Sequence, residues 1–441
     1  MEHLLQILVT LVVLYALARA GSAVVSRFGF PGLIGEILMG ILVANLVIGD
    51  FDLMSFLDLD MPEPGVEGDH GSGVYPVVYA LAELGVIFLL FTVGLETKVS
   101  DLMKSGKAAF FCALLGVIVP FILGFALIIG TDNALFGTEG TSLTHHALFM
   151  AAAMVATSVG ITARIIKDLH LMDTREARII IAAAVIDDVL GMIVLAIVKG
   201  MAASEDGISI GSVASITLQA CLFVLAVIAV CKWVVPKVYD RVMEYRKAKE
   251  AQGKRPIAVN MLVIAIITCL AMSALAEAIG LAAIIGAFLA GMLFADHAWE
   301  WDLESKIDSI STFMLSFFFL NVGLQVDIDV LSSGNVVLLI VITVILAIIG
   351  KYVGCSIGAK LGDRSLDRQS LNIIGFGMAP RGEVGIIVAS IGLASGAMSE
   401  NLYAVVVFMS VITTILAPPI VSRLFKRKYK EEYTILPEDR I

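Results

Sequence analysis

Charged residues are scarce in this sequence of 441 residues. Asp, Glu, Lys and Arg together account for only 16% of it, whereas hydrophobic residues account for 59% and the mean hydropathy is +0.95. A typical soluble domain has about 25% charged residues and cannot hide so much apolar side chain from water. The composition therefore excludes a soluble globular protein and indicates an all-α membrane protein with many spans.

The sequence also lacks the residue patterns that form disulfide frameworks, metal sites or catalytic sites. Its cysteines are scattered, with no CxxC pair and no Cys/His spacing typical of zinc. No nucleophile–base pair and no metal-ligand cluster is evident, so we expect neither enzymatic activity nor a cofactor. The first apolar run has an acidic start and no basic n-region, so we interpret it as a helix rather than a cleaved signal.

Apolar runs long enough to cross a bilayer recur along the whole chain. About 20 helical residues at about 1.5 Å each span the hydrocarbon region. We predict thirteen transmembrane helices, at residues 3–24, 31–49, 76–96, 107–130, 145–167, 175–200, 209–235, 257–278, 280–296, 308–325, 334–360, 369–393 and 400–424. They form a single transmembrane domain over residues 1–430, followed by a short cytoplasmic tail at 431–441.

The distribution of Lys and Arg predicts the orientation of these helices. If the N-terminus lies outside, all but four of the 30 lysines and arginines fall in loops on the inner side. Of those four, Lys199 lies outside, and Arg164, Lys351 and Arg381 lie within spans. By the positive-inside rule, we expect an outer N-terminus and a cytoplasmic C-terminus.

The two halves of the sequence resemble each other. Residues 93–102 (VGLETKVSDL) resemble residues 322–331 (VGLQVDIDVL), and each segment follows a Phe-rich span, the third and the tenth. Spans one to six and eight to thirteen therefore form two repeats, with span seven as a linker helix. Because the repeats start on opposite sides of the membrane they are inverted, which is typical of secondary transporters.

This repeat makes span five the counterpart of span twelve, and both contain residues that disfavour a continuous helix at mid-depth. Span five reads ATSVGIT at 156–162, and span twelve reads GFGMAPRGE at 375–383. Proline removes a backbone donor, and glycine lowers helix stability. We predict that both helices are discontinuous, cross at their breaks, and expose carbonyl groups to a cation. For either span alone, simple bending is the alternative.

Two adjacent carboxylates, Asp187 and Asp188, lie in the middle of span six. A charge at this depth costs about 3 kcal/mol on insertion scales, and such residues usually face a water-filled cavity and handle ions or protons. Lys351, in span eleven, requires a carboxylate partner, for which Asp187 or Asp188 is the best candidate. The alternatives are a structural carboxylate pair, and a Lys351 that snorkels to the inner surface.

Three more charges lie in the spans that we expect to break. Arg381 and Glu383 belong to span twelve, and Arg164 belongs to span five. We interpret them as structural charges that form an ion-pair cluster at the helix breaks; direct contact with the substrate is the alternative.

Taken together, these motifs resemble the cation:proton antiporter-2 family of bacterial monovalent cation/proton exchangers. The resemblance covers nearly the whole chain and rests on residues 156–164, 186–188, 321–324, 351 and 380–385. The double aspartate is similar to that of the family's electrogenic Na+/H+ antiporters, whereas glutathione-gated potassium-efflux relatives have Gln-Asp there. The family implies a homodimer with a scaffold of helices 1–3 and 8–10. It also implies a core of helices 4–6 and 11–13 that moves like an elevator.

The resemblance and the buried charges together imply a secondary transporter in the bacterial inner membrane. It would exchange Na+, and also Li+, for protons, because either ion neutralises the same carboxylates. We expect Asp188 to be the main ligand and proton carrier, and Asp187 to pair with Lys351 in the cation-free state. Thr157 and Ser158 would add oxygen ligands, which suit a hard cation. Two protons for one cation would make the exchange electrogenic.

Three other functions stay open at this point. A K+/H+ antiporter would use the same residues, since ion selectivity depends on cavity size and ligand number. A cation channel and a non-transporting sensor are the other two. The sequence has no GxGxxG motif in a strand–turn–helix context, so we expect no nucleotide-binding domain in cis. The expected partners are Na+ or K+, protons, membrane lipid and a second copy of the chain, but no nucleic acid.

Overall fold

The computed structural model describes residues 2–28, 30–48, 51–62, 71–97, 99–131, 143–203, 222, 260–279, 282–296, 298, 301–381 and 383–429. The first part of this chain contains α1 (Glu2–Arg27), α2 (Gly32–Asn45), α3 (Leu53–Phe56), α4 (Tyr75–Leu95), α5 (Val99–Ile129), α6 (Leu143–Val155), α7 (Val159–Asp168) and α8 (Arg175–Ala203). The second part contains α11 (Met261–Ala278), α12 (Ala283–Phe294), α13 (Leu303–Leu324), the 3-10 helix η2 (Ile328–Ser332), α14 (Gly334–Gly362), α15 (Arg368–Gly377), α16 (Glu383–Ala394) and α17 (Glu400–Lys428).

Four very short strands lie between α2 and α4 and form two antiparallel pairs. Strand β1 (Val47–Ile48) pairs with β2 (Phe51–Asp52), and β3 (Leu59–Asp60) pairs with β4 (Ser72–Gly73). Within the part of the chain described, the rest of the secondary structure is helical. The prediction of an all-α membrane protein is therefore confirmed, with these small hairpins as an addition that the sequence did not reveal.

The predicted spans coincide with helices wherever the structure describes them. Eight helices among the described residues are long and apolar enough to cross a membrane, and shorter apolar helices at 32–45, 283–294 and 384–394 accompany them. Span five corresponds to α6 and α7, and span twelve to α15 and α16, so both predicted helix breaks are present. The seventh predicted span, 209–235, and the tail at 431–441 lie outside the described residues, so the count of thirteen stays a prediction.

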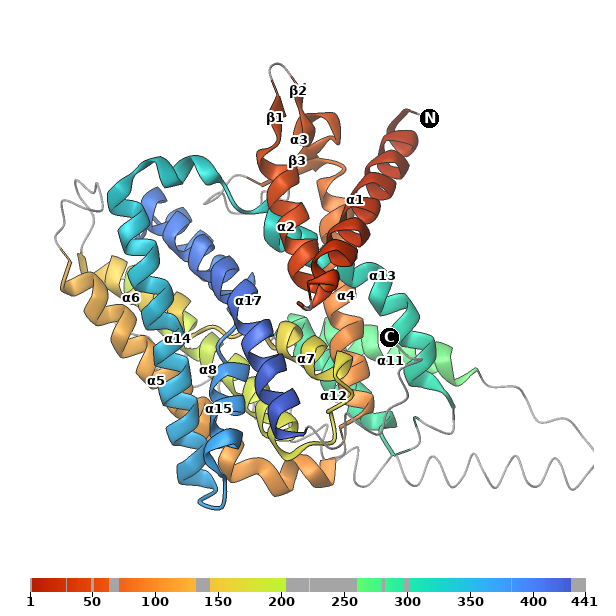
Figure 1. The fold of residues 1–441 in the computed structure, drawn as a ribbon, viewed down its shortest axis with the longest axis vertical. Coiled ribbons are helices and arrows are strands. Elements are labelled where there is room, and N and C mark those ends of the chain that lie inside the picture. The colour runs from red at the N-terminus through yellow and green to blue at the C-terminus, as the bar shows by residue number, and fades with distance from the viewer. Residues whose placement is uncertain are drawn as a thin grey trace, which may run out of the picture.

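The helices pack in two groups, which Figure 1 shows side by side. Group one consists of α1, α2, α4, α11, α12 and α13, and group two consists of α5 to α8 and α14 to α17. Helix α7 packs on α8 and α17 within group two and also on α4 of group one. The broken helices therefore both belong to group two, and α7 forms a direct contact between the groups.

Close main-chain approach at glycines holds several helix pairs together. A Cβ on Gly358 of α14 would meet the carbonyl oxygen of Phe111 in α5, and one on Gly354 would meet that of Leu115. In group one, a Cβ on Gly40 of α2 would lie 2.9 Å from the Cα atom of Gly323 in α13. Small residues allow membrane helices to pack this closely, where dispersion rather than the hydrophobic effect stabilises the contact.

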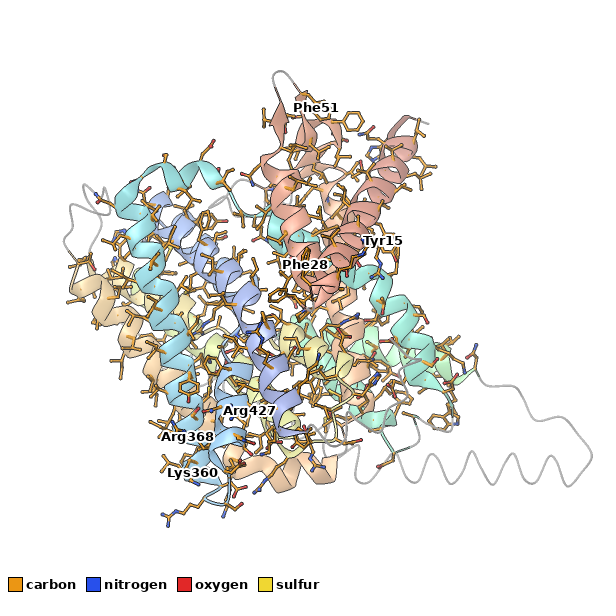
Figure 2. The ribbon with its side chains drawn as sticks, in the orientation of Figure 1. Tyr15, Phe28, Phe51, Lys360, Arg368 and Arg427 are labelled. Atoms are coloured by element: carbon orange, nitrogen blue, oxygen red, sulfur yellow. The ribbon has the colours of Figure 1, made fainter. Side chains whose placement is uncertain are left out.

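Basic side chains gather at one end of group two. Figure 2 shows Lys360, Arg368 and Arg427 at the lower end of the molecule, whereas Phe51, in the strand segment, lies at the upper end. Under the positive-inside rule the lower end is the expected cytoplasmic side. The first turn of α1 lies at the upper end as well (Figure 1).

A polar cluster at the basic end ties three helices of group two together. Lys428 Nζ, near the end of α17, lies 2.7 Å from Glu176 Oε1 in the first turn of α8 and 2.7 Å from Asp367 Oδ1, which caps α15. Tyr429 donates its hydroxyl hydrogen to the other oxygen of the nearly fully buried Glu176. Hydrogen bonds from Lys428 and Ser370 hold the pKa of Asp367 well below its usual range.

Candidate ion-binding site

The two breaks cross each other inside group two. Helix α6 ends at Val155 and α7 begins at Val159, while α15 ends at Gly377 and α16 begins at Glu383. The backbone N–H of Ser158 donates to the carbonyl of Pro380 at 2.9 Å, and the hydroxyl of Thr162 donates to the carbonyl of Gly377 at 2.6 Å. Because each break supplies partners for groups freed in the other, the irregular backbone is tolerated at membrane depth.

Thr157 and Ser158, the residues expected to supply oxygen ligands, lie at this crossing. Both are almost fully buried. The Thr157 hydroxyl lies 3.5 Å from the carbonyl of Met378, at the limit of a hydrogen bond. Ser158 is the N-cap of α7, yet its hydroxyl caps no backbone N–H, and its Oγ is buried without a hydrogen-bond partner in the structure. An oxygen in that position is suited to an ion that enters the crossing.

Asp187 and Lys351 form an ion pair in the interior of group two. Asp187 lies near the middle of α8 and Lys351 near the middle of α14, and their Oδ1 and Nζ atoms are 2.5 Å apart. The side chains are 1% and 0% exposed, so water does not screen the pair. Lys351 therefore does not snorkel to the surface. Removing either partner would leave a buried charge, which typically costs about 3–5 kcal/mol.

Asp188 has different surroundings from its neighbour. Successive residues of a helix point about 100° apart, so the two carboxylates of α8 face different directions. Asp188 is partly exposed within the molecule, whereas Asp187 is buried. Asp187 is thus the carboxylate that pairs with Lys351, as we expected from the sequence, and Asp188 is less buried than its neighbour.

Arg381 connects the crossing to the ion pair. Its side chain is fully buried and donates to the carbonyl of Ala156 in the first break at 2.5 Å and to that of Ala347 at 3.1 Å, one turn before Lys351 in α14. Carbonyl groups at the end of a helix carry partial negative charge and have no partner within the helix, so they attract a cation. Arg381 therefore satisfies the Ala156 carbonyl, which the break leaves open, and links the break to α14 through the carbonyl of Ala347.

The ion-pair cluster expected at the breaks differs from what the structure shows. Arg164 pairs with Asp168 one turn later in α7, at 2.9 Å, rather than with the second break. Arg381 binds the carbonyls described above, and the side chain of Glu383 lies outside the described part of the structure. The physical reason is that a broken helix supplies unpaired carbonyl groups, so Arg381 needs no carboxylate partner at the break.

Two glutamates of group one, Glu36 and Glu83, lie in different surroundings. Glu36 in α2 accepts a hydrogen bond from Ser316 of α13 at 3.2 Å and lies 3.7 Å from Arg19, so it cross-links group one. Glu83 in α4 lines a cavity of about 810 Å³ between the two groups, along with residues of α2, α13, α16 and α17. Asp187 and Asp188 are not part of the described lining of this cavity, which ends short of the ion pair.

Comparison with known proteins identifies the family of this chain. The family description "Sodium/hydrogen exchanger, transmembrane" matches residues 10–427. The chain belongs to this family of cation:proton antiporters. It is therefore a multi-pass membrane transporter that exchanges monovalent cations for protons.

Similar proteins support this membership along the full length of the chain. The chain is 31% identical over 445 residues to the high-affinity Na+/H+ antiporter NhaS3 of Synechocystis. The match covers 97% of this chain and 91% of NhaS3. It is 28% identical to the Na+/H+-K+ antiporter GerN of Bacillus cereus, with 92% of each covered. The structure of the sodium proton antiporter MjNhaP1 of Methanocaldococcus jannaschii matches with a TM-score of 0.57, 13% identity and 98% of each chain covered, which shows a shared fold.

Proposed function

We propose that this exchanger carries Na+ in one direction and protons in the other, and that one net charge crosses the membrane in each cycle. The buried pair of Asp187 and Lys351, next to the crossing of two broken helices, is the observation that carries this proposal. Asp188 is the main cation ligand and proton carrier, with Thr157 and Ser158 as further oxygen ligands.

The charge balance of the site explains the coupling of the two ions. A carboxylate held away from water is neutralised by a proton or by Na+, so the two ions compete for Asp188. When Na+ arrives near Asp187, it replaces the charge of Lys351, and the lysine is then free to release a proton. One cation thus displaces two protons, one from Asp188 and one from Lys351.

The packing supports an elevator type of alternating access. Both breaks, the two aspartates and Lys351 belong to group two, so the site is able to move as a unit against group one. In this proposal group two is the transporting core and group one is the scaffold of a homodimer. The protein would lie in the bacterial inner membrane with its N-terminus outside, surrounded by lipid.

Substitution of Asp188 by Asn tests the proposal. In proteoliposomes with an imposed pH gradient, Asp188→Asn removes the ionisable carboxylate and is expected to abolish Na+-driven proton movement. Asp173→Asn, which changes an exposed aspartate between α7 and α8, is the matched control and keeps wild-type rates. Wild-type exchange by Asp188→Asn would remove this residue from the site.

A K+/H+ antiporter is the second candidate. The relative GerN is named as an antiporter of Na+, protons and K+ and matches over nearly its whole length, which favours testing K+ in this chain as well. The same proteoliposomes, supplied with Na+, Li+ or K+ in turn, distinguish the candidates. A response to K+ alone would replace Na+ as the substrate, without changing the roles of the carboxylates.

A further inference from the structure

Lys167 makes ionic contacts between the two groups of helices. It lies near the end of α7 in group two. Its Nζ atom is 2.8 Å from Asp308 Oδ1 of α13 and 3.7 Å from Glu96 Oε1 at the end of α4, both of which belong to group one. The side chains of Lys167 and Glu96 are 13% and 18% exposed and that of Asp308 is 41% exposed, so the contact is partly shielded from solvent. By contrast, the ion pairs of Arg175, Lys306, Lys351 and Lys428 each stay within one group.

The cavity between the groups lies at the opposite ends of the same helices. It is lined by Tyr75 and Tyr79 at the start of α4, and by Gln325 directly after α13. On the other wall it is lined by Ala394 at the end of α16 and Glu400 at the start of α17. The groups are therefore separated at one end by a hollow of about 810 Å³ and joined at the other end by Lys167.

The predicted topology shows on which side of the membrane the cavity and the Lys167 contact lie. Helix α4 runs inward from the outer surface and α13 runs outward, so the cavity faces outside and the Lys167 contact lies at the cytoplasmic face. On this basis, which rests on the proposed function, we infer that this is the outward-facing form of the exchanger. In it, Lys167, Asp308 and Glu96 form a latch that holds the groups together on the cytoplasmic side.

The latch has a direct consequence for transport. For group two to slide along group one and expose the site to the cytoplasm, Lys167 must leave Asp308 and Glu96. The latch thus stabilises the outward-facing form relative to the inward-facing one, without touching the ion itself. Loss of the latch shifts the equilibrium between the two forms by the free energy of the ion pair and leaves the site residues unchanged.

Distance measurements between spin labels test this inference. Labels on Gln325→Cys and Glu400→Cys, in a protein otherwise free of cysteine, lie on opposite walls of the cavity and report its opening by pulsed electron resonance. The long distance corresponds to the outward-facing form. Because an exposed or partly exposed pair contributes up to about 1 kcal/mol, Lys167→Gln is expected to lower the ratio of long to short distances about threefold to fivefold.

Control variants make the result decisive. Lys167→Arg keeps the positive charge and is expected to keep the wild-type ratio of distances. Lys306→Gln removes a lysine that pairs within group one, so it is also expected to keep the wild-type ratio. If Lys167→Gln does not fold, Asp308→Asn breaks the same contact from the other side. An unchanged ratio in the latch variants, or an equal shift in Lys306→Gln, would overturn the inference. The distance measurement does not depend on transport. If the proposed function failed, the latch variants would still show the expected change in the ratio of long to short distances, but the protein would exchange no ions in proteoliposomes.

Discussion

Replacing Lys351 by Gln should separate exchange from its electrical coupling. The Asp187–Lys351 pair is 2.5 Å long and almost fully buried, so the variant leaves Asp187 without its cation at a cost of about 3–5 kcal/mol. A bound proton avoids most of that cost. Asp187 is then neutral throughout the cycle, no lysine proton is released when the cation binds, and each cation exchanges for one proton.

The magnitude of this effect follows from the charge that crosses. One elementary charge moving through 100 mV corresponds to about 2.3 kcal/mol, which is a factor of about 50 in an equilibrium concentration ratio. In proteoliposomes with a clamped membrane potential, the wild-type Na+ ratio at a fixed pH gradient should therefore change about 50-fold per 100 mV. Lys351→Gln should show almost no dependence on voltage while some exchange remains.

Two further variants complete the experiment on Lys351. Lys360→Gln changes an exposed lysine on the same helix and should keep the full voltage dependence. The double variant Asp187→Asn with Lys351→Gln removes both charges, so it should recover most of the thermal stability that Lys351→Gln loses. A Lys351→Gln protein that retains the 50-fold response would refute the assignment of the second proton to this lysine.

Two predictions concern stability and are read as unfolding midpoints in detergent. Gly358→Ala places a methyl group against the main chain of α5 and should cost about 1–3 kcal/mol, whereas Gly334→Ala on the same helix meets no atom within 4 Å and should be nearly neutral. Asp367→Asn keeps the α15 cap but loses the charge facing Lys428. The pKa of Asp367 is lowered in the folded protein. The ionised carboxylate therefore stabilises the folded state above its usual pKa of about 3.9, and this stabilisation is lost as the pH falls through the lowered pKa. The loss of stability, up to about 1 kcal/mol, should thus be seen at pH 7 and shrink toward pH 3.

The sequence predicted the helices and the positions of the two helix breaks well. Apolar runs of bilayer length, and Pro380 in a glycine-rich segment, are local signals, and the breaks at 156–158 and 378–381 lie where these signals indicated. The choice of partner for Lys351 depends on how α8 and α14 rotate against each other. Sequence spacing does not contain that angle, so the charges alone left Asp187 and Asp188 equivalent as partners. The expectation that Asp187 is the partner was added only with the family resemblance, and the structure shows this pairing.

Other features could not be read from the sequence because they depend on the packing of distant helices. The contact of Lys167 with Asp308 joins residues 141 positions apart, and both residues look like ordinary solvated charges at span ends. Likewise, Arg381 binds carbonyl groups, which every residue possesses and no motif marks. Long-range geometry, not residue type, decided these contacts.

The polar cluster of Glu176, Asp367 and Lys428 has a mechanical consequence. It fastens the last turn of α17 to the first turn of the helix that carries Asp187 and Asp188. A fused reporter or a bound protein just beyond Lys428 would exert force on α17. The contacts of Lys428 with Glu176 and Asp367 would transmit that force to α8, which carries the two aspartates. A reporter attached to the strand segment between α2 and α4 would not act on these contacts. The site of attachment therefore decides whether a tagged exchanger behaves like the untagged one.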